Sequence, residues 1–191
     1  MSGNEQRMTP EQAVEDWLRR MGEVSTSEPA GGVPSGTRLT RSPNPAVLSS
    51  MKFVKRRTIP GRQVHALSYS DTAAGDKWFW IMRLIEDAEG SWRVCGGGGG
   101  SGESPEREAP WINLAGSWGK YGLALGGRVA GRGADRAASA RLRIGDSVFV
   151  DDVRNGVVTF VTSDPTAGTA AIELLAQDGS ILWGDDVQLD D

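Results

Sequence analysis

The sequence predicts a mostly β protein that begins with one helix. Two observations support this: short apolar runs alternate with polar residues from residue 47 onward, and turn dipeptides separate many of these runs. In the C-terminal part these dipeptides are Gly145-Asp146, Asn155-Gly156, Asp178-Gly179 and Gly184-Asp185. We therefore expect a helix and linker over residues 1–45, an antiparallel β region over 46–118 and a small β-sandwich over 119–191.

The first expected element is a short amphipathic helix. Thr9 has the position of an N-cap, Pro10 that of the first helical residue, and Gln12 that of a capping-box partner. An apolar stripe follows at helical spacing, formed by Val14, Trp17, Leu18 and Met21. Gly22 predicts the end of the helix, and the residues from 23 to 45, rich in Ser, Pro and Gly, predict an extended linker.

The antiparallel β region contains one strand that is apolar at every position, Trp78–Met82. A strand of this kind is expected to be covered on both faces. Glu89-Gly90 predicts a hairpin turn into the following strand, Ser91–Cys95. The glycine run Gly96–Gly100 predicts a flexible or irregular segment, because glycine stabilises regular structure poorly.

The C-terminal region has the short strands and tight turns of a sandwich. Its segments Arg141–Ile144, Asn155–Val161 and Ala171–Ser180 resemble a small immunoglobulin-like module of the kind found in bacterial proteins. The resemblance covers about a third of the chain and lacks the Cys…Trp…Cys framework of true immunoglobulin domains. It implies a fold and no function.

Charge is unevenly distributed along a chain whose net charge is −4. Seven basic and no acidic residues lie between Gly36 and Arg62, whereas the chain from Gly145 onward has ten acidic residues and one basic. The basic segment Lys52–Arg57 could contact a nucleic acid, but the acidic chain disfavours that reading. We expect either a charged edge strand or pairing with the acidic C-terminal part.

The chain shows no sign of an oxidising compartment or a membrane. Cys95 is the single cysteine, so no internal disulfide is possible. Residues 1–10 lack the apolar core of a signal peptide, and no apolar run approaches the ~20 residues of a membrane span. The sequence therefore predicts a cytoplasmic protein.

No catalytic, cofactor or metal motif is complete. Ala115–Gly119 approximates a nucleophile elbow around Ser117, but the elbow needs a strand-to-helix turn, so a turn between strands is expected instead. The glycine run matches a dinucleotide fingerprint only formally, since Pro105 follows where a helix should begin. The acidic pairs Asp151-Asp152 and Asp190-Asp191 offer oxygen ligands for calcium without an established loop pattern. We expect no catalytic residue, cofactor or metal.

The candidate ligand-binding residues are aromatic. They are His65, Trp78, Trp80 and Trp92. Trp78 and Trp80 share one strand face, which suits an aromatic platform and suits core packing equally well. The expected function is a non-enzymatic binding protein whose partner is another protein or a second copy of the chain. The alternative is a small-molecule-binding protein or a hydrolase with a Trp-lined pocket near His65. A deep cavity containing His65 beside a carboxylate or Ser117 would favour this alternative, and a filled core would favour the binding protein.

Overall fold

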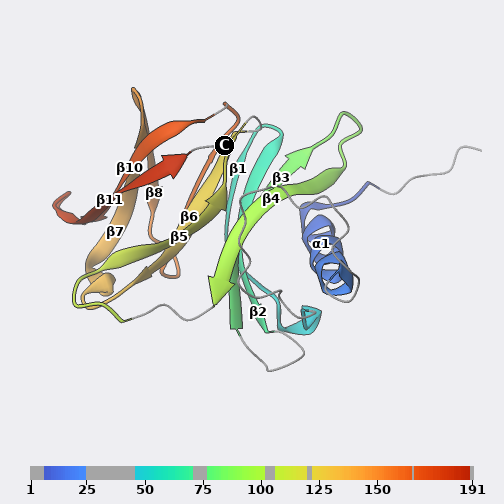
Figure 1. The fold of residues 1–191 in the computed structure, drawn as a ribbon, viewed down its shortest axis with the longest axis horizontal. Coiled ribbons are helices and arrows are strands. Elements are labelled where there is room, and N and C mark those ends of the chain that lie inside the picture. The colour runs from blue at the N-terminus through green and yellow to red at the C-terminus, as the bar shows by residue number, and fades with distance from the viewer. Residues whose placement is uncertain are drawn as a thin grey trace, which may run out of the picture.

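The computed structural model describes residues 7–24, 46–70, 77–101, 106–119, 122–164 and 166–189. These residues form one α-helix and three antiparallel sheets, which lie in successive layers (Figure 1). The helix is at the right of Figure 1, and the three sheets follow toward the left. The prediction of a mostly β protein is confirmed. No helix in the described ranges is long and apolar enough to cross a membrane.

The N-terminal helix α1 (Pro10–Val24) begins with the predicted capping box. The amide of Gln12 donates to Oγ1 of Thr9 (3.2 Å), and the amide of Thr9 donates to Oε1 of Gln12 (2.9 Å). The predicted end at Gly22 is wrong, because the helix continues to Val24. The buried residues Ala13, Val14 and Leu18 pack on one face of the first sheet.

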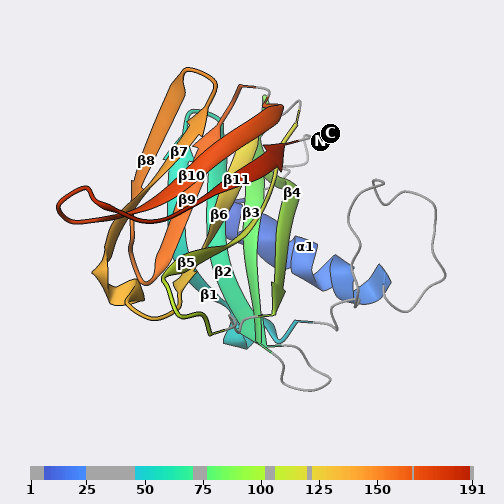
Figure 2. The ribbon, with the colours of Figure 1, turned by 60° about the vertical axis from the view of Figure 1, so that its left-hand side comes forward.

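The first sheet is a meander with the order β1-β2-β3-β4 (Figure 2). Its strands are β1 (Lys52–Ile59), β2 (Arg62–Ser70), β3 (Lys77–Glu86) and β4 (Trp92–Ser101). Residues 78–85 of β3 are all buried, which confirms the prediction of a strand covered on both faces. One face lies under α1, and the other faces the second sheet.

The glycine run does not form a loop, so that prediction is wrong. Gly96–Gly100 continues β4 and pairs with β3. A Cβ at Gly98 would lie 2.6 Å from the carbonyl oxygen of Gly116 and 2.7 Å from its nitrogen, and one at Gly99 would lie 2.3 Å from the carbonyl oxygen of Phe79. The absence of side chains therefore lets β4 contact its neighbours through backbone atoms.

The second and third sheets pack face to face as a β-sandwich. The second sheet has the order β5-β6-β9 and the third β11-β10-β7-β8. The strands are β5 (Trp111–Ser117), β6 (Leu123–Ala130), β7 (Ala137–Ile144), β8 (Ser147–Asp152), β9 (Val157–Thr162), β10 (Gly168–Ala176) and β11 (Ile181–Leu189). Their core includes Leu125 and Phe160 from the second sheet and Leu142 and Ile172 from the third. Because β5 pairs with β6, hydrogen bonds join the segments on either side of residue 118.

The predicted turns have different outcomes. Gly145-Asp146 joins the paired strands β7 and β8, and Asp178-Gly179 joins β10 and β11, as expected. Asn155-Gly156 forms a tight turn with positive φ at both residues, 53° and 68°, but the strands beside it belong to different sheets. The turn predicted at Gly184-Asp185 is wrong, because Gly184 lies inside β11 and pairs with Glu173.

The two β regions share a hydrophobic layer. Val64, Phe79 and Ile81 of the first sheet pack against Ala124 and Val157 of the second. The second sheet is therefore buried on both sides, by the first sheet and by the third. The open end of the layer between the first two sheets holds the site described next.

Candidate functional site

Three of the predicted ligand-binding residues are tryptophans of the core beneath α1. Trp78 and Trp80 are buried on the helix-facing side of β3, and Trp92, half-buried on β4, packs against the same cluster. Trp80 meets Trp17 of α1 edge to face, with ring centroids 5.4 Å apart. These rings fill the space between the helix and the first sheet, which is how large aromatic side chains stabilise a core. Their role in ligand binding stays a prediction.

His65 lies in the same layer and is 1% exposed. Its Nε2 donates to Oε1 of Gln63 (2.7 Å), and the ring of Phe53 stands 5.3 Å away, edge to face. Burial lowers the pKa of His65 to about 4, more than nearby Glu11 raises it, and Arg56 lowers it further. A shallow groove of about 280 Å³ passes His65 and Glu11, and Glu11 is paired with Arg56 at 2.7 Å. His65 is therefore neutral at physiological pH.

Ser117 is on the other side of the first sheet. A Cβ on Gly96 of β4 would meet its Oγ at 2.9 Å and the guanidinium of Arg83 at 3.2 Å, which places it between the first two sheets. His65 faces α1, so the sheet itself separates the two residues. The turn expected at Ala115–Gly119 is wrong for its first three residues, since Ala115–Ser117 lie in β5, and the next element of the chain is the strand β6 rather than a helix. The geometry brings no Ser–His pair together.

Most of the basic segment is neutralised within the protein. Lys55 and Arg57 of β1 both reach Asp151 of β8, at 2.5 and 3.1 Å. The backbone amide of Thr159 donates to the same carboxylate at 2.6 Å. The prediction that the segment pairs with the acidic C-terminal part is thus confirmed for these two cations. Asp190 and Asp191 lie outside the described residues, and among those described no group of three or more potential ligands could hold a metal ion.

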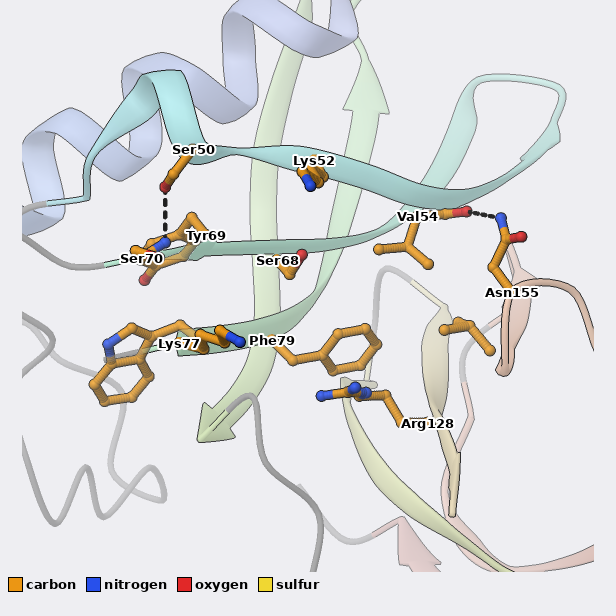
Figure 3. A pocket seen from close by; sticks show the side chains of 12 residues that line it. Ser50, Lys52, Val54, Ser68, Tyr69, Ser70, Lys77, Phe79, Arg128 and Asn155 are labelled. Atoms are coloured by element: carbon orange, nitrogen blue, oxygen red, sulfur yellow. Dashed lines mark hydrogen bonds between the residues drawn. The ribbon is translucent and has the colours of Figure 1, made fainter. Parts of the chain in front are cut away.

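Lys52, at the start of the same strand, has a different environment. It lines a cavity of about 600 Å³ between the first two sheets (Figure 3). We call this the cationic pocket. Its polar lining residues are Lys52, Lys77, Arg128, Asn155 and the serines Ser50, Ser68 and Ser70; its other lining residues are Val54, Tyr69, Trp78, Phe79 and Val157.

No family model and no curated protein matches this chain.

Strand register places the polar residues of the cationic pocket side by side. Lys52 of β1 is opposite Ser68 of β2, Ser68 is opposite Phe79 of β3, and Ser70 is opposite Lys77. Arg128 enters from β6 of the second sheet, with its guanidinium carbon 5.7 Å from the centre of the Phe79 ring. Alternation along each strand makes these side chains share the sheet face that turns toward the second sheet.

The charged side chains that line the cationic pocket all have the same sign. The pocket has three basic side chains, Lys52, Lys77 and Arg128, and none of its described lining residues is acidic. In the described part of the chain, no carboxylate forms an ion pair with any of the three. The connection 71–76, which includes Asp71 and Asp76, lies outside that part. Cations with low-dielectric walls on one side attract anions.

Sequence reasoning found this pocket only in part. It singled out Lys52 within the basic segment and Trp78 as a ligand candidate, and both residues line the cavity. It missed Lys77 and Arg128, since neither has another cation within three residues in the sequence. The available signal was a lysine at the start of a fully apolar strand, where the charge must point out of the core.

Proposed function

We propose that the protein is a non-enzymatic binding protein that holds a small anionic molecule in the cationic pocket. The observation that supports this most directly is the gathering of Lys52, Lys77 and Arg128 around one cavity whose described lining has no carboxylate. Its volume, about 600 Å³, lies in the range of small-molecule sites. As part of the same proposal, the C-terminal sandwich is an immunoglobulin-like module and the protein acts in the cytoplasm.

The lining of the pocket suits binding better than catalysis. Its polar side chains are two lysines, an arginine, a tyrosine, an asparagine and three serines, and neither a histidine nor a carboxylate is among its described lining residues. His65, the single histidine, lies on the opposite face of the first sheet. A hydrolase built on His65 and Ser117 therefore receives no support from this geometry, whereas a binding site requires only complementary charge and shape.

Calorimetric titration tests the proposal. Benzenesulfonate and benzoate should bind, and neutral benzamide should not, because the attraction comes from charge. Lys52→Met should weaken benzenesulfonate binding by about tenfold, since a charge-assisted contact contributes about 1.5 kcal/mol. Arg56→Met is the matched control: Arg56 is a cation of the same strand that pairs with Glu11 outside the pocket. Equal weakening of benzenesulfonate binding by Lys52→Met and Arg56→Met would show that binding depends only on the net charge of the protein and not on the cationic pocket.

Recognition of another protein, or of a second copy, is the other candidate function. β8 is at the edge of the third sheet and exposes Val148 and Val150, 57% and 51% accessible. An exposed apolar edge strand can pair with another chain. Light scattering at rising concentration would reveal self-association, and Val150→Lys should abolish it. A particle that stays monomeric and retains no partner from its native cell would rule this candidate out.

A further inference from the structure

We propose that the ligand of the cationic pocket is a small phosphomonoester, bound as its dianion by Lys52, Lys77 and Arg128. This inference rests on the proposed function and specifies the chemical class of the anion. A carboxylate or sulfonate has one negative charge, whereas a phosphomonoester has nearly two above its second pKa, about 6. The distinction can be measured because the charge of a phosphomonoester changes near pH 6, whereas that of a sulfonate does not.

The positive charge that lines the cationic pocket favours an anion with more than one negative charge. Lys52, Lys77 and Arg128 line one cavity, and a monoanion would leave two of these cations uncompensated. Like charges facing the same cavity repel one another, and a dianion relieves more of this repulsion than a monoanion does. A phosphate group also has three terminal oxygens, which gives it more acceptors than a carboxylate.

The cationic and hydroxyl donors of the pocket lie on both sides of the Phe79 ring. Figure 3 shows Lys52 and Ser68 on one side of the Phe79 ring and the Arg128 guanidinium on the other. The donors therefore come from three strands of the first sheet and one of the second, β6. A planar carboxylate presents two oxygens in one plane, whereas phosphate oxygens diverge toward donors on several sides. Arginine is well suited to phosphate because its planar fork can donate two parallel hydrogen bonds.

The remaining lining accommodates the organic part of the ester. Half-buried Val54 of β1 lies beside the cations, and the buried side chains of Phe79 on β3 and Val157 on β9 add a small apolar area. Phe79 is 5% exposed and its ring is held against Arg128, so it forms a fixed surface. The volume of this open pocket, about 600 Å³, suits a small molecule better than a polymer. This favours a phosphorylated metabolite with an apolar or aromatic group over a nucleic acid strand.

Phosphate recognition predicts a pH dependence that follows the charge of the ligand. The single histidine lies across the first sheet with a pKa of about 4, so it stays mostly neutral above pH 5. With a ligand pKa near 6, about a tenth of a phosphomonoester is dianionic at pH 5 and nearly all of it at pH 7.5.

The experiment compares phenyl phosphate with benzenesulfonate, which keeps a single charge throughout. Calorimetric titration of the full chain at pH 5.0 and pH 7.5 gives the four dissociation constants. Phenyl phosphate should bind about tenfold more tightly at pH 7.5, in line with its dianionic fraction, and benzenesulfonate should change by less than about twofold. Lys52→Met should reduce the ratio between the phenyl phosphate dissociation constants at pH 5.0 and pH 7.5, and Arg56→Met should leave that ratio unchanged.

The outcomes separate this inference from the function on which it rests. If both probes bind and neither depends on pH, the pocket binds anions but does not select a phosphate dianion, and the inference is overturned. If neither probe binds, the proposed function fails as well. Inorganic phosphate lacks the group that would cover Phe79, so it should bind more weakly than phenyl phosphate. Equal affinities for inorganic phosphate and phenyl phosphate would overturn the inference that the ligand is an ester.

Discussion

Replacing Asp151 by asparagine should destabilise the protein far more than the same change at its exposed neighbour Asp152. Asp151 is the common partner of Lys55 and Arg57, which extend from the first sheet to the third. Its Oδ2 also accepts the backbone amide of Thr159 at 2.6 Å. The asparagine side chain keeps the shape but removes the charge that compensates the two cations.

The size of the effect follows from burial. The Lys55 side chain is 8% exposed and that of Asp151 is 12% exposed, so water can replace little of the lost interaction. Removing one partner of a buried ion pair typically costs about 3–5 kcal/mol, because the other charge stays buried and unpaired. A domain is usually stable by about 5–15 kcal/mol, so this loss is a large part of the total.

Urea unfolding at pH 7, followed by far-UV circular dichroism, measures the loss. Asp151→Asn should lower the midpoint without changing the slope, which would show that stability rather than compactness has changed. Asp152→Asn is the matched control, since its side chain is 69% exposed and lies 3.6 Å from Arg154. An exposed pair contributes at most about 1 kcal/mol. Equal shifts for the two neighbouring variants would refute the reasoning.

Three further predictions concern the backbone, pH and metal ions. Gly98→Ala should lower the free energy of unfolding by about 1–3 kcal/mol, since its Cβ would lie 2.6 Å from a backbone oxygen. A Cβ at Gly100 would have no atom within 4 Å, so Gly100→Ala should leave stability almost unchanged in the same urea assay. Folded His65 has a pKa of about 4, against 6.5 in the unfolded chain. The free energy of unfolding should therefore fall by up to about 3 kcal/mol as the pH is lowered from 6.5 to 4. His65→Gln should make this dependence of stability on pH weaker. Thermal melts in EDTA and in calcium should coincide; a rise of several degrees with calcium would point to the C-terminal aspartates.

The elements that were predicted correctly depend on neighbours in the chain. Thr9 and Gln12 cap the helix across three residues, and their hydrogen bonds form as expected. The apolar run in β3 predicts burial on both faces, because every side chain of such a strand needs cover. Asp178-Gly179 closes a hairpin between adjacent strands for the same local reason.

Other features depend on which segments meet in space. The glycine run has the composition of a linker, yet it continues β4 and pairs with β3. Gly116 of a different strand approaches Gly98 so closely that there is no room for a side chain. Likewise, nothing in the sequence distinguishes Lys52 from Lys55. Lys55 meets Asp151, 96 residues further on, whereas Lys52 faces a cavity shared with Arg128.

The sequence by itself determined the class of the fold, the start of the helix and the largely apolar central strand, since propensity and periodicity are local properties. Tertiary structure alone decided which cations are neutralised and which stay available. Charge compensation depends on distance in space, falling with separation and with exposure to water. Sheet packing brings Asp151 to Lys55 and leaves Lys52, Lys77 and Arg128 around one cavity without a described carboxylate. The candidate site is therefore a property of how the first two sheets pack together.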